Sequence, residues 1–487
     1  MDISIKKGIL FEQFCDILIV YVFQGVDRFD DFISKILKEE KFKAKLCQTV
    51  LIRTGGHLPA KRVLVVGLGK KEEFDFQSLR RATASAYFSA KSIEPKTIVS
   101  EFFNTSDFES KEIAQAVTES IRLADYSFTK YKKENGNGKR KPQSFEFVTD
   151  DGRIIKKVQS GISLGELTAR ATIFARDLIN TPTQDMSPRH LVEFAKSIAK
   201  GKSTIRVRVF DEEKLEKMGA GGILGIAKGS DDPPFFVHMI YHPKIKAKKK
   251  IAIVGKGVTF DSGGLSLKPA ASMSTMKIDM AGAADVLGLF SVINEIAPAV
   301  EVHGIFAAVE NMPSGRAVRP GDILKAMNGK TMEILNTDAE GRVILADSLV
   351  YATKQKPDMI VDLATLTGAC MVALGEEITG LLSNDSKLAN LILTAAAKVS
   401  EKMWELPLEK NYKQFTKSDV ADLKNIGGKY GDVISAGLFL EEFVNKTPWA
   451  HLDIAGPSFA ERDFDEYTKK GATGHGVRTL IEFLRGF

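Results

Sequence analysis

Short apolar runs alternate with longer amphipathic runs beyond about residue 205, and this alternation constrains the fold more than any other feature of the sequence. Strand-like runs occur at residues 235–241, 251–254, 302–309, 331–335, 359–363 and 450–454. Helix-like runs lie between most of them, at 281–296, 342–354, 386–402 and 436–444. Because strands that are separated by helices pair in parallel, the pattern predicts an α/β fold with a central, mostly parallel sheet that is flanked by helices.

The N-terminal part shows the same alternation on a smaller scale. Strand-like runs at 16–23 and 62–66 and an amphipathic run at 112–125 indicate a small α/β domain. Residues 158–180 are typical of one long helix, which ends near Pro182 because the residue before a proline disfavours helical backbone. We therefore predict a smaller N-terminal α/β domain at 1–157, a connecting helix at 158–180 and a larger C-terminal α/β domain at 181–487.

Composition excludes several classes of protein. The 487 residues include three cysteines, Cys15, Cys47 and Cys370, with no close pair, so a disulfide scaffold is excluded and a reducing compartment, the cytoplasm, is expected. The longest apolar run near the N-terminus, 17–23, is far shorter than the ~20 residues that cross a membrane, so no membrane attachment is expected. The net charge of +6 is small for this length and allows nucleic acid binding without requiring it.

Charged residues follow two of the predicted strands. Lys256, Asp261, Lys268 and Asp279 come after the run at 251–254, and Asp338, Glu340 and Arg342 come after the run at 331–335. In open α/β sheets, ligands collect outside the carboxyl ends of the strands. Four carboxylates at one edge, in a chain with few histidines, suit a divalent metal ion. Each residue alone is also typical of a helix cap, a turn or solvated surface, so a metal site and ordinary structural roles both stay open.

The local sequence supports this placement. Asp338 and Glu340 are two residues apart, so in extended backbone their carboxylates point to the same side. Two like charges held together raise each other's pKa unless a cation offsets them. Asp279 stands near the start of the helix-like run at 281–296, where the helix dipole favours an anion.

The segment 336–347, NTDAEGRVILAD, closely resembles the signature of the leucine aminopeptidase (cytosol aminopeptidase) family of two-zinc exopeptidases. Four further segments are similar to motifs of this family: VGKGVTFDSGGLSLKP at 254–269, MKIDMAGAADV at 276–286, DLATLTGAC at 362–370 and GATGHGVRTL at 471–480. The resemblance extends from about Ala175 to the end of the chain. Val343 and Ile278 depart from the family's usual residues, and neither departure removes a metal ligand.

The resemblance implies that 181–487 is a catalytic domain that binds two divalent metal ions, zinc or manganese. One ion would be bound by Lys256, Asp261, Asp279 and Glu340, and the other by Asp261, Asp338 and Glu340. A lysine binds a metal only as the neutral amine, so Lys256 would have to lose its proton. A water or hydroxide that bridges the two ions would then attack the scissile carbonyl.

The same resemblance implies the remaining roles. Lys268 would stay protonated and stabilise the oxyanion of the tetrahedral intermediate, and Arg342 would hold a bicarbonate ion that acts as general base. A free α-amine would bind one metal ion and reach Asp279, so single residues would be released from peptides with a free amino end. Met276, Asn336, Thr365 and Gly368 would line a pocket that suits leucine and other apolar side chains. The family forms homohexamers, dimers of trimers, and the same is expected of this chain.

Two other functions stay open beside the aminopeptidase. Some bacterial relatives of this family also bind specific DNA sequences, and the charge of +6 and the basic segments 130–142 and 244–250 suggest such a role. A hydrated surface loop and a hydrated lead-in to the strand at 251 explain these segments more simply, and we favour that interpretation. A metal phosphoesterase would use similar carboxylates, but the family motifs do not support it.

Overall fold

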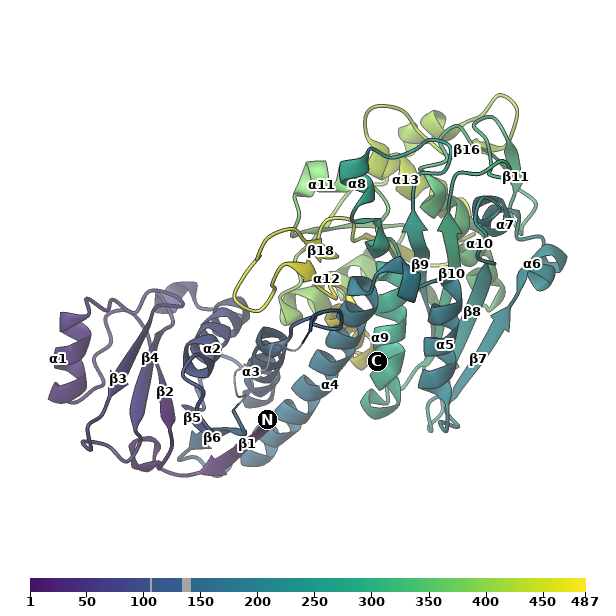
Figure 1. Cartoon of the computed structure of the whole chain (residues 1–487). Helices are drawn as coiled ribbons and strands as arrows, with labels where there is room; N and C mark the ends of the chain where they lie inside the picture. Colours follow the sequence, from purple (N-terminus) through teal and green to yellow (C-terminus); the bar gives the residue numbers. More distant parts are fainter. Residues whose placement is uncertain (106, 134–141) are drawn as a thin grey trace. The chain divides into compact units, whose positions relative to one another are not determined.

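The computed structural model describes residues 1–105, 107–133 and 142–487, which form two compact units (Figure 1). Unit 1 comprises Met1–Ala169 and Asp463–Lys469, and unit 2 comprises Arg170–Arg462 and Lys470–Phe487. The division falls inside the long helix α4 (Ile155–Asn180), so a separate connecting helix at 158–180 stays a prediction. Residues 134–141 of the predicted basic loop lie outside the described residues.

Unit 1 is built on one six-stranded sheet. Its strands are β1 (Asp2–Lys7), β2 (Ile17–Val22), β3 (Thr49–Arg53), β4 (Arg62–Gly67), β5 (Thr97–Glu101) and β6 (Ser144–Thr149), and its helices include α1 (Asp31–Glu39), α2 (Phe76–Lys91) and α3 (Ser110–Asp125). The strand order is β1-β6-β5-β2-β4-β3, and only the β3–β4 pair is antiparallel. Every residue of β2 is buried, as its uninterrupted apolar sequence predicts for an inner parallel strand.

Unit 2 is built on an eight-stranded sheet. Its strands are β7 (Ile205–Phe210), β8 (Phe235–Tyr241), β9 (Lys250–Asp261), β10 (Glu301–Asn311), β13 (Met359–Ala364), β14 (Thr379–Ser383), β15 (Met403–Glu405) and β17 (Trp449–Asp453). They follow the order β15-β14-β17-β13-β9-β10-β8-β7. The four central strands are parallel, as predicted, and antiparallel pairs join β8 and β14 to them. The two-domain α/β fold is therefore confirmed, with a sheet that is mixed toward its edges.

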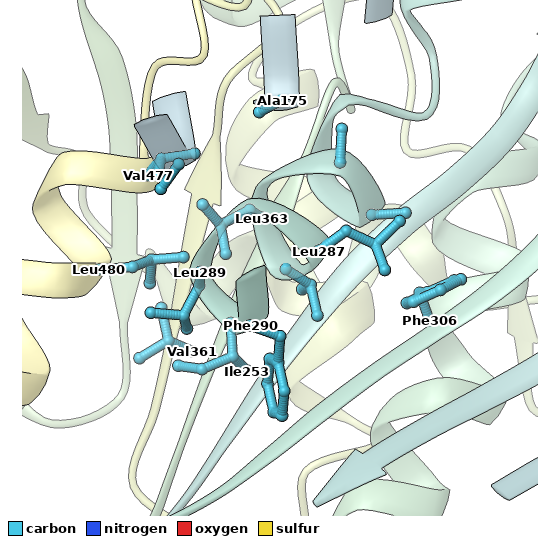
Figure 2. Packing of buried hydrophobic residues seen from close by; sticks show 14 of the residues in the cluster. Ala175, Ile253, Leu287, Leu289, Phe290, Phe306, Val361, Leu363, Val477 and Leu480 are labelled. Atoms are coloured by element: carbon cyan, nitrogen blue, oxygen red, sulfur yellow. The ribbon is translucent and has the colours of Figure 1, made fainter. Parts of the chain in front are cut away.

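Helices cover both faces of this sheet. They include α5 (Pro188–Ala199), α6 (Glu212–Met218), α7 (Gly221–Ala227), α9 (Ala281–Ile296), α10 (Glu340–Lys354), α12 (Ser386–Val399), α13 (Asp432–Glu441) and α14 (Val477–Arg485). Alternate residues of β9 point to opposite faces, so Ile253 packs in the cluster with α9 and Val254 in the cluster with α10. Figure 2 shows Leu289 and Phe290 of α9 beside the strand residues of the first cluster. None of the described helices is long and apolar enough to cross a membrane.

The run predicted at 331–335 does not belong to the eight-stranded sheet. It forms β12 (Thr331–Glu333), which lies in a separate three-stranded sheet between β11 (Ile323–Lys325) and β16 (Leu423–Lys424). Of the three residues of β12 only Met332 is buried, whereas inner strands of the large sheet are buried at nearly every position. The prediction that two strand ends of one sheet carry the site was therefore wrong for this strand.

Candidate metal centre and substrate cavity

Strand β9 carries two of the predicted site residues. Lys256 and Asp261 lie inside its carboxyl-terminal half, whereas the sequence pattern placed them beyond the strand. The strand is longer than predicted because β10 pairs with it as far as Asn311, opposite Asp261. A Cβ on Gly255 would lie 2.4 Å from the backbone of Gly282, so this glycine allows α9 to pack directly against the strand.

Lys256 lies among acceptors from three different segments. Its Nζ is 2.7 Å from Oδ1 of Asp279 and 2.8 Å from Oε1 of Glu340, and it donates to the backbone oxygen of Thr365 at 3.0 Å. Asp279 lies two residues before α9 and Glu340 is the first residue of α10, where the helix dipoles favour negative charge. The side chains of Lys256, Asp279 and Glu340 are at most 5% exposed, so this cluster is shielded from water.

Lys268 joins the two remaining carboxylates. Its Nζ lies 2.8 Å from Oδ2 of Asp261 and 2.5 Å from Oδ1 of Asp338. Oδ1 of Asp261 accepts hydrogen bonds from the backbone N–H of Gly263 at 2.9 Å and from Nδ2 of Asn311 at 2.8 Å. The position of the Asp261 carboxylate is therefore fixed from both sides.

Asp338 and Glu340 come together in a way that the sequence did not predict. Ala339 between them is the N-cap of α10, with φ −101° and ψ 43°, so the backbone is not extended as the prediction required. The amino end of α10 nevertheless brings Glu340 close to Asp338. One oxygen each of Asp261, Asp338 and Glu340 lie within 4.8 Å of one another.

The centre holds more negative than positive side chains. Burial raises the pKa of the Asp279 carboxyl well above its usual value against the opposing effect of Lys256, and the carboxylates of Glu340 and Asp261 add to the rise. Burial alone would lower the pKa of Lys256, but Asp279, Glu340 and Asp261 raise it overall. Two lysines cannot neutralise the four carboxylates of Asp261, Asp279, Asp338 and Glu340, and added cations would remove this repulsion.

The donor set fits divalent metal ions. Oδ2 of Asp279 is buried and accepts no hydrogen bond from the residues that the structure describes, although buried carboxylate oxygens are normally paired. The converging oxygens of Asp261, Asp338 and Glu340 are the ligands that hard and borderline divalent ions prefer. Lys256 can add a nitrogen ligand, provided that its amine is neutral.

These carboxylates open onto a cavity of about 660 Å³ in unit 2. Ten of the eleven predicted site residues line it: Lys256, Asp261, Lys268, Met276, Asp279, Asn336, Asp338, Arg342, Thr365 and Gly368. Glu340, the eleventh, is 1% exposed and lies beneath the surface of the cavity. Arg342 donates to the backbone oxygen of Asn425 at 2.9 Å and to Oδ1 of Asp432 at 3.3 Å, which holds its guanidinium at the cavity wall.

The sequence did not predict the structural roles of three residues at this site. Asn311 at the end of β10 binds Asp261, as described above, and Thr365 donates through Oγ1 to Oδ1 of Asp279 at 2.7 Å. Asp453 at the end of β17 accepts from the N–H of Leu366 at 3.2 Å and from Oγ1 of Thr367 at 2.7 Å. Asn311 and Asp453 each end an apolar strand, so the strand-end rule that singled out Lys256 and Asp261 could have found both.

Comparison with known sequences decides the family. The catalytic-domain model of the cytosol aminopeptidase family matches residues 173–481, and the N-terminal-domain model of the same family matches residues 24–135. The chain belongs to the cytosol aminopeptidase family. It is accordingly a metal-dependent aminopeptidase, a hydrolase of peptide bonds.

Individual members of the cytosol aminopeptidase family are similar over nearly the whole chain. The probable cytosol aminopeptidase of Alkaliphilus oremlandii is 40% identical over 100% of this chain and 99% of its own length, and that of Aquifex aeolicus is 44% identical over 93% and 90%. Among solved structures, a tomato leucine aminopeptidase variant is 35% identical with a TM-score of 0.89, covering 100% of this chain and 97% of that one. The bottromycin maturation enzyme BotP in complex with Mn is 33% identical with a TM-score of 0.87, covering 97% and 99%.

Proposed function

We propose that this cytosol aminopeptidase binds two divalent metal ions, zinc or manganese, and releases leucine and other apolar residues from the amino end of peptides. The observation that carries the proposal is the convergence of the Asp261, Asp338 and Glu340 carboxylates beside one cavity. The similarity to the tomato leucine aminopeptidase and to BotP in complex with Mn supports the substrate and the metal.

The metal ligands follow from the clusters around the two lysines. Lys256, Asp261, Asp279 and Glu340 would hold one ion, and Asp261, Asp338 and Glu340 would hold the other. When bound, such ions lower the pKa of a coordinated water and polarise a carbonyl group. The protein holds the four carboxylates in place through buried contacts, among them the bond from Asn311 to Asp261 and the bond from Thr365 to Asp279.

Lys268 is the residue that supplies positive charge to the reacting carbonyl. Burial alone would lower the pKa of its ammonium, but Asp261 and Glu340 raise it overall, so the group keeps its proton at neutral pH. Its side chain lines the cavity and is 14% exposed, so a substrate oxygen can approach it. The ammonium can therefore donate to the oxyanion of a tetrahedral intermediate.

Arg342 offers a planar guanidinium to a small planar anion, and we assign bicarbonate to it. Its bonds to Asn425 and Asp432 hold one side of the guanidinium, and the group also lines the cavity. The seven histidines all belong to the described residues and none of them lines the cavity, so none is placed there as a general base. A bicarbonate at Arg342 would supply an acceptor for a proton.

The pocket for the amino-terminal side chain is assigned to Met276, Asn336, Thr365 and Gly368. A Cβ on Gly368 would meet no atom within 4 Å, so the wall is open at this position and leaves room for a leucine side chain. Met276 contributes a flexible apolar surface. Oδ2 of Asp279, which has no donor among the described residues, is available to bind a metal ion or the free α-amine.

We further propose a homohexamer that acts in the cytoplasm, where the three free cysteines would stay reduced. We do not propose DNA binding. In the basic segment 244–250, Lys249 pairs with Asp358 and Lys250 with Glu301, which fits the interpretation of a hydrated lead-in to β9.

Hydrolysis of leucyl-4-nitroanilide tests the proposal. The purified chain should be active with Mn²⁺ or Zn²⁺, lose activity when a chelator removes the metal completely, and regain it when Mn²⁺ is added back. Full activity after complete metal removal would refute the metal centre. Light scattering on the same sample should give the mass of six chains.

A further inference from the structure

One wall of the cavity runs outward from the metal centre to an acidic residue. It begins at Thr365, which binds both Lys256 and Asp279. It continues through Gly368 and Met371 of α11 (Gly368–Leu374) and reaches Glu376, and all of these residues line the cavity. This wall contains two of the residues that we assign to the pocket for the first side chain.

A second segment, 455–461, completes the same wall. Ala455, Phe459 and Glu461 of this segment also line the cavity. A Cβ on Gly456 would lie 2.7 Å from the backbone oxygen of Gly375 and 3.3 Å from Cα of Glu376, so the two segments are in direct backbone contact. The backbone of Glu376 is therefore held against the wall that carries Ala455 and Glu461.

Glu376 and Glu461 give this wall a negative charge. Apart from the metal-centre residues and the Arg342–Asp432 pair, they are the charged residues that line the cavity in the described chain. Oε2 of Glu376 is buried and accepts no hydrogen bond from the described residues. The guanidinium of Arg462 lies 3.4 Å from this oxygen, but its side chain is 61% exposed and it does not line the cavity.

We propose that Glu376 and Glu461 adapt the cavity to peptides whose amino-terminal residue is lysine or arginine, in addition to leucine. This inference rests on the proposed aminopeptidase function. A long basic side chain would pack its aliphatic stem on Met276, Met371 and Phe459 and bring its cationic end to the two carboxylates. Leucine, which is shorter and uncharged, would use only the apolar part of the same wall.

The test compares substrates that differ only in charge. Arginyl- and citrullinyl-4-nitroanilide have side chains of nearly equal length, as do the lysyl and norleucyl compounds. With the metal-loaded full-length protein at low salt, we expect kcat/KM for the charged member of each pair to exceed that of the neutral member by about tenfold, as two partly exposed ion pairs would give. The ratio should fall as salt is added.

Variants then assign the effect to the two glutamates. Glu376→Gln combined with Glu461→Gln should bring the arginine-to-citrulline ratio close to one, and Arg462→Gln should increase it because a competing cation is removed. Glu213→Gln is the control, since Glu213 of α6 pairs with Lys217, does not line the cavity and does not contact Arg462, and it should leave the ratio unchanged.

Three results would overturn this inference. The first is equal hydrolysis of arginyl and citrullinyl substrates by the unaltered protein, and the second is a ratio that the double variant does not change. The third is an effect of the double variant only on dipeptides with arginine in the second position. In each case hydrolysis of the leucyl substrate would leave the aminopeptidase function standing, whereas failure to hydrolyse any of these substrates would refute that function itself.

Discussion

The two sheets of this protein share an architecture but differ at the carboxyl ends of their parallel strands. In unit 1, β2 leads into Phe23 and β5 leads toward Phe103. These two rings and Phe74 pack edge to face with one another at centroid distances of 5.2 to 5.6 Å. Aromatic side chains therefore lie at these two strand ends, beside Glu101, the last residue of β5, whose charge is paired with Arg28 at 2.8 Å.

In unit 2, the corresponding ends carry charged side chains that cluster at one cavity. Lys256 and Asp261 lie at the end of β9, Thr365 follows β13 and Asp453 ends β17. All four are at most 9% exposed, yet they are held by ion pairs and hydrogen bonds rather than by apolar contacts. The α/β fold therefore provides a position for a functional site at the carboxyl ends of the strands. The side chains at those ends determine whether a site forms there.

The largest effect should follow from removing a carboxylate of the metal centre. Glu340→Ala should lower kcat by about 1,000-fold or more, as loss of an essential group does in other enzymes. Measured kcat with excess Mn²⁺ checks this. Glu212→Ala is the matched control, because Glu212 is likewise the first residue of a helix, α6, but is exposed. Activity of the Glu340 variant within tenfold of the unaltered protein would show that our ligand assignment is wrong.

A smaller loss of activity should follow from disturbing Asp453. The Asp453→Asn variant would place an amide where the carboxylate accepts from Leu366 and Thr367, and so loosen the segment that carries Thr365 and Gly368. We expect kcat/KM to fall by about 10- to 100-fold, as for other residues that orient metal ligands.

Asp385→Asn provides the control for Asp453. Asp385 accepts from the N–H of Leu388 at the start of α12, and it does not line the cavity. This variant should lower the melting temperature without lowering kcat/KM. Equal kcat/KM for the two variants would contradict a positioning role of Asp453.

Replacing an aromatic residue at the strand ends of unit 1 should lower the stability of the protein and leave its catalytic activity unchanged. Phe74→Ala removes a partly buried ring that contacts Phe23 and Phe103, and we expect unfolding of unit 1 to become easier by about 2 kcal/mol. Urea unfolding monitored by circular dichroism checks the stability. A tenfold or greater loss of kcat in the folded variant would contradict the claim that these strand ends of unit 1 contribute to stability and not to catalysis.

The smallest effect concerns a buried histidine pair elsewhere in the sheet of unit 2. Nε2 of His238 on β8 lies 2.8 Å from Nδ1 of His303 on β10, and Nδ1 of His238 lies 3.0 Å from the hydroxyl of Tyr351. Burial, helped by the charges of His303 and Arg208, lowers the pKa of His238 to about 3.

The sign of the resulting pH dependence follows from this depressed pKa. The unfolded chain takes up a proton near pH 6.5 and the folded chain does not, so stability is full above that pH and is lost as the pH falls toward 3, by at most about 1.4 kcal/mol per pH unit. Melting temperatures between pH 7 and pH 4.5 should fall less steeply for His238→Gln than for the unaltered protein. Equal slopes would refute the assignment.

Much of the fold could be predicted because the apolar periodicity is strong. The predicted strand at 235–241 and the predicted helix at 281–296 agree with β8 and α9 at both ends. Periodicity failed where close backbone packing replaces side-chain contacts, as at Gly255 and Gly282, so β9 is much longer than its apolar run. It also could not distinguish β12, a short strand of a small sheet, from a strand of the large one.

The candidate site was predictable in its residues but not in its geometry. The resemblance to the family motifs singled out Asp338 and Glu340. The turn at Ala339, which brings their carboxylates together, has no periodic pattern in the sequence that could predict it. Glu376 and Glu461 could not be found from the sequence, because acidic residues in loops are usually solvated. Only the contact between Gly456 and the backbone of Gly375 and Glu376 places them on one wall.

The most direct test of the account is the number of metal ions that the site binds. Mn²⁺ titrated into the metal-free full-length protein, followed by calorimetry and elemental analysis, should give two ions per chain. Glu340→Ala should bind fewer than two, and the Glu212→Ala control should still bind two. Absence of stoichiometric binding to the unaltered protein, or two ions bound by the Glu340 variant, would contradict a metal centre built from these carboxylates.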